Sequence, residues 1–385
     1  MKKFLRPSFV LSPSQKTRSA QRAAFPLLSL ALLTLGLQLA HAQAPLTPVT
    51  QVAPLPAAAA PVAHVIQISV DAMGAKYLDK FLQESPQDFN NFGRLIKEGA
   101  STLNARADYT FTITLPNHTC MVTGRPVDTP PEWPEAQGHY WKWNGDFPSP
   151  DAPASLHAVN PAGGYTASSF DVAHDNGLST ALYSGKEKFH MFTYSFGPEL
   201  GAENAHGRNK IDYSIIGSGI HDKALADIKL HKPAYTFLHY PDPDSAGHAF
   251  GYLGPEYRDA VKKVNGYIGD LLSLAETDPE WKNRTVIILS ADHGGRPGTK
   301  NHGDADQPYN YTIPFLVWGA GVPQGADLYK LNPTTRTDPG DGRPPYAPTG
   351  QPIRNGDGGN LALKLLGLPA IPGSHINDKQ DLSVR

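Results

Sequence analysis

"RTVIILSA", from Arg284 to Ala291, is an almost wholly apolar run in a chain of 385 residues. A strand with one solvent-exposed face alternates apolar and polar residues, whereas a strand that is buried on both faces of a parallel sheet is continuously apolar. The segment before it, Pro255–Glu276, carries apolar residues at helical spacing: Val261, Val264, Ile268, Leu271 and Leu272. A long helix that leads into a buried strand predicts one unit of an open α/β sheet.

The same alternation continues in both directions along the chain. Further strands are predicted at "HVIQISV" (His64–Val70), "KPAYTFLHY" (Lys232–Tyr240) and "YTIPFLVWG" (Tyr311–Gly319), and helices at residues 88–100 and 360–368. We therefore expect an α/β domain over residues 64–385, with a central, mainly parallel sheet sandwiched between helices. Residues 130–164 are rich in proline, glycine and aromatic residues, which predicts a small cap-like insertion.

The N-terminal region has the character of a secretory signal peptide. Basic residues precede the apolar stretch Phe25–Leu39, and "AHAQ" then gives a small-residue cleavage pattern, so we expect residues 1–42 to be removed after Ala42. A retained membrane anchor is the alternative, but the apolar stretch is shorter than the ~20 residues of a spanning helix. No stable membrane insertion is expected after cleavage, and the protein is predicted to be periplasmic or secreted. Residues 43–63, rich in proline and alanine, are predicted to form a linker.

Composition limits the classes of partner. The formal net charge is −2 for the whole chain, and the predicted signal peptide carries only basic charges, so the remaining domain is more acidic. Such a domain offers no general electrostatic attraction for a nucleic-acid polymer. Cys120 is the only cysteine, which excludes an internal disulfide.

Carboxylates and imidazoles follow three of the predicted strands. The residues are Asp71 after the first strand, Asp244 and His248 after the second, and Asp292, His293 and His302 after "VIILSA". A single aspartate there is commonly a helix N-cap, and a single histidine is commonly structural. Together they form a mixed oxygen and nitrogen set suited to Zn²⁺, and burying three carboxylates side by side without a cation would be costly. We therefore predict a pair of metal ions.

Five motifs in fixed order resemble those of one family. The motifs are "ISVDAMG", "TLPNHTCMVTGRP", "PDSAGH", "ADHGG" and "NHGD", and the similarity extends from His64 to Asn377. The chain resembles the alkaline phosphatase superfamily, and within it the type I phosphodiesterase/nucleotide pyrophosphatase family. The resemblance implies an alkaline-phosphatase-like fold with two Zn²⁺ ions, although other divalent metals remain possible. One ion would be held by Asp71, Asp292, His293 and the Thr114 hydroxyl, and the other by Asp244, His248 and His302.

Thr114, which stands before "LPNH", is implied as the catalytic nucleophile. A threonine hydroxyl is a poor nucleophile at neutral pH, and coordination to a cation supplies the missing activation. The expected function is a two-zinc hydrolase of small phosphate esters, nucleotide-type esters among them, of the diesterase/pyrophosphatase type, acting through phospho-Thr114. The alternatives are a phosphomonoesterase or phosphonate hydrolase, and more remotely an inactive zinc-binding recognition protein.

Residues around the nucleophile are harder to assign. The resemblance offers Asn144 as a substrate-binding residue, while a turn residue before Gly145 is the competing interpretation. Asn117 is interpreted as a capping residue of the helix that follows Thr114. Lys186 and Lys188 could bring positive charge toward the phosphate, but lysines are common on surfaces, so both are interpreted as surface lysines and left out of the site.

Overall fold

A computed structural model of the chain describes residues 61–133, 136–346 and 349–385. The chain divides into two compact units, residues 1–56 and 57–385, and the fold below is that of the second. The predicted signal peptide and residues 43–60 of the predicted linker lie outside the described residues. Among the residues that are described, no helix is both long and apolar enough to cross a membrane.

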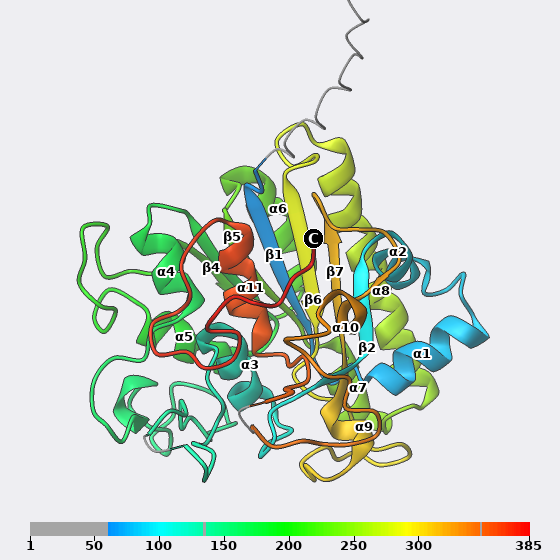
Figure 1. Cartoon of the computed structure of the whole chain (residues 1–385), viewed down its shortest axis with the longest axis horizontal. Coiled ribbons are helices and arrows are strands. Elements are labelled where there is room, and N and C mark those ends of the chain that lie inside the picture. The colour runs from blue at the N-terminus through cyan, green and yellow to red at the C-terminus, as the bar shows by residue number, and fades with distance from the viewer. Residues whose placement is uncertain (1–60, 134–135, 347–348) are drawn as a thin grey trace, which may run out of the picture. The chain divides into compact units, whose positions relative to one another are not determined.

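An eight-stranded sheet forms the centre of the domain, in the order β4-β3-β5-β1-β6-β7-β2-β8 (Figure 1). The five strands β4, β3, β5, β1 and β6 run parallel, while β7 is antiparallel to both β6 and β2. The strands are β1 (His64–Val70), β2 (Ala100–Arg106), β3 (Thr180–Ser184), β4 (Tyr213–Ile216), β5 (Tyr235–Tyr240), β6 (Thr285–Ser290), β7 (Thr312–Gly319) and β8 (Ala326–Asp327). The predicted fold class, a mainly parallel α/β sheet, is confirmed.

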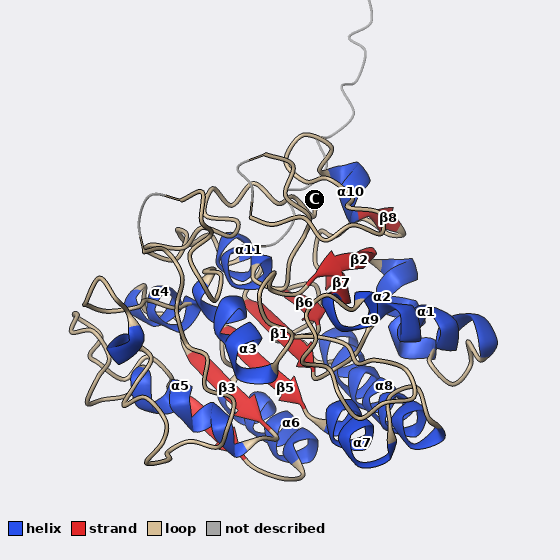
Figure 2. Cartoon of the chain, turned by 90° about the horizontal axis from the view of Figure 1, so that it is seen from below, coloured by secondary structure: helices blue, strands red, loops and turns tan. Residues whose placement is uncertain are grey.

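Helices cover both faces of this sheet (Figure 2). Helices α3, α4 and α11 lie on one face, and α6 and α8 lie on the other. The helices are α1 (Ala75–Glu84), α2 (Asn90–Glu98), α3 (Thr114–Thr123), α4 (Ser169–Asp175), α5 (His190–Ser195), α6 (Ile220–His231), α7 (Asp242–Phe250), α8 (Pro255–Thr277), α9 (Pro308–Tyr311), α10 (Leu328–Leu331) and α11 (Asp357–Leu365). The five apolar residues predicted to share one face of α8 are all buried.

The three central strands are buried along their whole length. Every residue of β1, β5 and β6 is buried, as expected for strands with helices on both sides.

Between Thr123 and Ser169, the described residues contain no regular element except a short 3-10 turn at His157–Val159. The cap-like role of residues 130–164 stays a prediction, although Trp141 within them is fully buried.

The carboxyl ends of the parallel strands meet at one edge of the sheet. β1 ends at Val70, β3 at Ser184, β5 at Tyr240 and β6 at Ser290, and these four strands are neighbours. Ligands of open α/β sheets gather outside this edge. The side chains that follow these four strands therefore converge there.

Candidate metal centre

The first group of predicted ligands is fully buried. Asp71 follows β1, and Asp292 and His293 follow the adjacent strand β6, so the parallel pairing of the two strands brings these residues together. His293 Nε2 lies 3.6 Å from Asp71 Oδ1 and 3.2 Å from Asp292 Oδ2. Ligands at the corners of a tetrahedron with zinc bonds of about 2 Å lie roughly 3.3 Å apart, so this spacing fits a single cation. We call Asp71, Asp292 and His293 the buried triad.

Each residue of the buried triad has one polar atom without a partner. Asp71 Oδ1, Asp292 Oδ2 and His293 Nε2 are buried and form no hydrogen bond. Buried polar atoms are almost always paired, because an unpaired one loses its hydration without compensation. Three such atoms facing one another indicate that the triad is built around a bound group.

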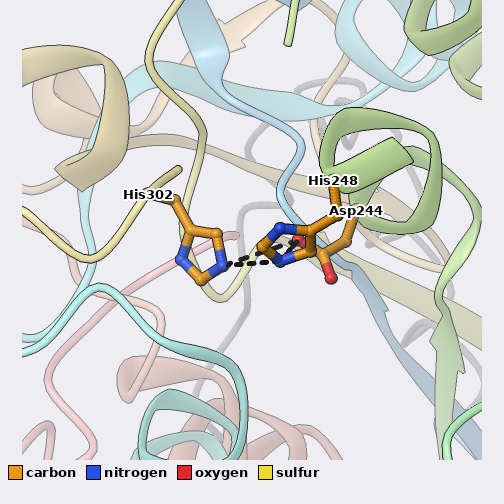
Figure 3. Close-up of side chains that lie close together, drawn as sticks. All are labelled: Asp244, His248 and His302. Atoms are coloured by element: carbon orange, nitrogen blue, oxygen red, sulfur yellow. Dashed lines mark hydrogen bonds and ion pairs between the residues drawn. The ribbon is translucent and has the colours of Figure 1, made fainter. Parts of the chain in front are cut away.

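The second group comes from α7 and from the loop after β6. Asp244 and His248 are four residues apart on α7, which places them on the same face of the helix. His302 approaches from the opposite side, and Figure 3 shows its ring and that of His248 facing each other beside Asp244. The two Nε2 atoms are 3.1 Å apart, and they lie 3.4 Å (His248) and 3.7 Å (His302) from Asp244 Oδ1. We call these three residues the open triad, because the side chain of His248 is 50% exposed.

Backbone carbonyls orient all three histidines. The Nδ1 atoms of His248, His293 and His302 lie 2.6–3.0 Å from the carbonyl oxygens of Lys300, Gly294 and Thr112. A carbonyl oxygen can only accept, so each Nδ1 donates and each Nε2 of the neutral ring presents a lone pair to the site. Two lone pairs 3.1 Å apart repel, and a cation between them removes that repulsion. This arrangement is typical of metal-binding histidines.

Further residues fix the carboxylates. Asp292 Oδ1 accepts hydrogen bonds from the backbone N–H groups of Ala72 and His293, which leaves Oδ2 for the site. Asp244 Oδ1 accepts one from the Tyr252 hydroxyl, and His239 Nε2 lies 2.9 Å from Asp71 Oδ2. The sequence analysis did not identify His239 or Tyr252, because neither belongs to a motif with ligand spacing.

A local turn is adapted to this geometry. Ala72 has a φ of 58°, in the left-handed region that favours glycine, and its N–H reaches Asp292 Oδ1 at 3.0 Å. The sequence analysis noted the resemblance of "ISVDAMG" to the family motif. The positive φ gives a physical reason for a small residue directly after Asp71.

Lys186 connects the two triads, and its interpretation as a surface lysine is wrong. It follows β3, and its Nζ lies 2.6 Å from Asp71 Oδ2 and 2.5 Å from Asp244 Oδ2. Its side chain is only 17% exposed. The rings of His293 and His302 are also stacked, with centroids 3.8 Å apart, so the triads form one continuous centre.

Charge at the centre is unevenly distributed. Burial, reinforced by the negative charge of Asp71, holds the pKa of Asp292 well above its usual range. Burial also opposes ionisation of Asp71, yet the Lys186 ammonium and His239 keep the pKa of Asp71 well below its usual value. Burial lowers the pKa of His293 to about 3, so this ring is neutral and available as a ligand. Lys186 thus offsets only part of the negative charge, and a divalent cation would allow Asp292 to ionise as well.

The residues present therefore fit two divalent cations. The donor set consists of carboxylate oxygens and neutral imidazole nitrogens, the ligands that Zn²⁺ and related metals accept. The structure brings all six predicted ligand side chains together in two groups of three. Their role as ligands, and the identity of the metal, stay predictions.

Thr114 is the first residue of α3. Its backbone carbonyl accepts a hydrogen bond from His118, whose ring lies 3.6 Å from Asp292 Oδ2. Two residues earlier, Thr112 contacts His302 through both its hydroxyl and its carbonyl group. Thr114 is only 1% exposed. Its role as nucleophile stays a prediction.

Asn144 lies beside Thr114. Its Oδ1 accepts a hydrogen bond from the backbone N–H of Leu115 at 2.8 Å, so it caps the start of α3 from a distant loop. Lys188 Nζ lies 2.5 Å from the Asn144 carbonyl oxygen. Lys188 is therefore also near the centre, although it contacts neither triad. A substrate-binding role for Asn144 stays a prediction.

Asn117 holds the loop that precedes Thr114. Its Oδ1 accepts from the Asp108 N–H and from Asn355, while its Nδ2 donates to the carbonyl oxygens of Phe111 and Ile113. It therefore ties residues 108–113 to α3, which is a wider role than the capping that the sequence analysis predicted.

We expect Asn117→Ala to lower the free energy of unfolding by about 3 kcal/mol, because four hydrogen bonds, two buried and two partly buried, are lost at once. Urea denaturation of the purified protein measures the loss. Asn209→Ala is a suitable control, because Asn209 is exposed and makes a single side-chain hydrogen bond. Equal stability of the two variants would contradict the structural role of Asn117.

Comparison with known families gives a match over most of the domain. Residues 65–129 and 136–312 match the family described as type I phosphodiesterase/nucleotide pyrophosphatase. Among characterised relatives, GPI ethanolamine phosphate transferase 1 of Mus musculus is 27% identical over 140 residues, which cover 34% of this chain and 15% of that protein. This chain thus spans a small part of that relative's length.

Solved structures are similar in fold. Murine ectonucleotide pyrophosphatase/phosphodiesterase 5 superposes with a TM-score of 0.55 at 16% identity, covering 83% of this chain and 99% of that one. An inactive form of it in complex with AMP gives the same TM-score at 15% identity and the same coverage. A protein of the alkaline phosphatase superfamily from Vibrio parahaemolyticus gives a TM-score of 0.50 at 18% identity, covering 83% and 70%.

Proposed function

The chain belongs to the type I phosphodiesterase/nucleotide pyrophosphatase family, and from this premise we propose that it is a two-metal phosphodiesterase that forms a phospho-Thr114 intermediate. Family and fold are those of enzymes that hydrolyse or transfer phosphoester groups. The finer assignment, including zinc as the metal, Thr114 as the nucleophile and a periplasmic or secreted location, is our proposal.

One observation carries this proposal. The partnerless atoms Asp71 Oδ1, Asp292 Oδ2 and His293 Nε2 converge within the buried triad, next to a second triad of the same ligand types. A purely structural ion-pair network would satisfy these atoms internally. Two adjacent groups of this kind support a centre for two cations, which is the arrangement suited to displacement at phosphorus.

The residues of the chain suggest how the reaction would proceed. When bound, the cations would lower the pKa of a coordinated hydroxyl and neutralise charge on the phosphoryl oxygens. Thr114 Oγ would attack phosphorus, and the bond from phosphorus to the leaving alcohol or nucleotide would break as the Thr114–phosphorus bond forms. Water would then attack phosphorus and release Thr114. The position of Thr114 at the N-terminus of α3 adds the favourable end of a helix dipole.

Asn144 would act from the same side of the centre. Its Oδ1 accepts from the Leu115 N–H, so its amide group is held next to Thr114. An uncharged amide near the phosphoryl group suits the single negative charge of a diester. A nucleotide-type substrate is supported by the AMP held in the murine structure of similar fold.

Two other activities have an observation in their favour. Lys186 brings a positive charge to the centre, and such a charge favours the doubly charged group of a phosphomonoester or a phosphonate. The relative named GPI ethanolamine phosphate transferase 1 supports transfer of the phosphoryl group to an alcohol instead of water. All three activities share the first chemical step at Thr114.

A substrate panel separates these activities. We expect kcat/KM for a bis-aryl phosphate to exceed that for the matching aryl monophosphate by at least tenfold, because the diester carries one negative charge. A preference for the monoester would overturn the diesterase assignment and support the second activity. Addition of ethanolamine or glycerol as acceptor tests for transfer. A transferase would convert most of the bis-aryl phosphate into a mixed diester of the added alcohol, whereas we expect the aryl monophosphate and the aryl alcohol that hydrolysis releases.

A further inference from the structure

Lys186 reaches both triads with a single ammonium group. Its Nζ lies 2.6 Å from Asp71 Oδ2 in the buried triad and 2.5 Å from Asp244 Oδ2 in the open triad. In the described part of the chain, Lys186 is the only lysine or arginine that pairs with either carboxylate. The other groups that contact these two carboxylates are histidines and a tyrosine hydroxyl.

We propose that Lys186 is an internal counter-ion that holds the carboxylates of both triads in the metal-free protein and competes with divalent cations for them. The inference rests on the proposed function only in taking the triads as cation sites. It assigns to Lys186 a role in metal loading that is separate from any contact with substrate.

The charges explain why an ammonium sits here. Asp71 and Asp244 lie in a centre from which water is largely excluded, and two like charges so placed repel strongly. The Lys186 ammonium contacts an oxygen of each, and so removes most of this repulsion while the triads hold no metal. The metal-free centre is therefore held together by Lys186.

The same contact opposes metal binding. Lys186 contacts Oδ2 of each aspartate, and the ring nitrogens of His293, His248 and His302 face Oδ1. A cation bound at Oδ1 would lie within a few ångströms of the ammonium on the same carboxylate, so the two positive charges would repel. This repulsion weakens cation binding unless the lysine moves away. A lysine can do so readily, because its ammonium is a compact charge on a flexible four-carbon stem.

Lys188 provides a matched comparison. It is two residues away and half-buried, and its Nζ contacts the carbonyl oxygen of Asn144 and not a triad carboxylate. Removing its charge also makes the electrostatic field at Asp71 and Asp244 less positive, because Lys188 interacts with both charges without contacting them. Removing the Lys188 charge leaves the contacts of Lys186 with Asp71 and Asp244 in place.

The test is a titration of metal-stripped full-length protein with Zn²⁺ alone, followed by competition with a chelating dye. We expect Lys186→Met to lower the Kd of the weaker site at least tenfold, whereas Lys188→Met and the charge-conserving Lys186→Arg stay within threefold of the wild type. We also expect the metal-stripped Lys186→Met protein to melt several degrees below the metal-stripped wild type, and the two Zn²⁺-loaded proteins to melt at similar temperatures.

Two results would overturn the role of Lys186 while leaving the proposed function intact. These are an unchanged or higher Kd in Lys186→Met, or an equal gain of affinity in Lys188→Met, which would reflect the general field and not displacement. If neither the wild type nor any variant binds Zn²⁺, both the inference and the proposed function fail. If Lys186→Met does not fold, Lys186→Gln provides the same comparison, because it keeps a polar group of similar length without the charge.

Discussion

Thr114→Ala is expected to lower kcat for phosphodiester hydrolysis by about 10⁴-fold or more, because it removes the only hydroxyl proposed to attack phosphorus. The fold should be retained. Thr114 is the first residue of α3, and alanine is a better helix former than threonine. The measurements are kcat with a bis-aryl phosphate, circular dichroism and metal content of the purified variant.

Two further variants sharpen this result. Thr114→Ser keeps a hydroxyl at the same position and should retain activity well above that of Thr114→Ala. Thr110→Ala removes an exposed hydroxyl four residues earlier and should leave kcat within twofold of the wild type. Full activity in Thr114→Ala would show that the nucleophile is misassigned, even if both triads bind metal as proposed.

Parallel strands explain why the six predicted ligands could be placed at one edge of the sheet from sequence, whereas their division into two groups came from the family resemblance. Asp71 and Asp292 follow strands rich in β-branched and other apolar residues, and parallel strands end at the same edge of a sheet. Asp244 and His248 are four residues apart on one helix, so their proximity is also encoded locally. His302 was identified only by its motif, because nothing in its own spacing points toward α7.

Residues that act through tertiary contacts could not be identified in this way. Lys186 and His239 reach Asp71 across neighbouring strands, and no sequence period relates a lysine after β3 to an aspartate after β1. Lys186 was left out of the site because most lysines are exposed on protein surfaces. That rule applies to unpaired lysines, and it fails here because Lys186 is paired with two buried carboxylates. The antiparallel direction of β7 could not be predicted from the sequence either, because an apolar strand pattern does not distinguish parallel from antiparallel pairing.

Removal of metal is expected to abolish hydrolysis without unfolding the protein. Dialysis against a chelator should lower kcat at least 10³-fold, and Zn²⁺ should restore it, because activation of Thr114 and neutralisation of the phosphoryl oxygens both depend on the cations. The fold should survive, since Lys186 pairs with Asp71 and Asp244, and burial raises the pKa of Asp292, which favours the neutral form of that carboxyl when no cation is bound. The measurements are kcat and the circular dichroism spectrum before and after Zn²⁺ is returned.

Substitution of one predicted ligand tests whether the loss of activity on metal removal depends on the open triad. His302→Ala removes one of its three ligands, and leaves Asp244 and His248 with too few donors for tight binding. We expect metal-stripped His302→Ala to need at least tenfold more Zn²⁺ than the wild type for half of its maximal activity. His206→Ala, which removes an exposed histidine, should titrate like the wild type. Undiminished activity after chelation, or the same Zn²⁺ requirement in both variants, would contradict a catalytic metal at this centre.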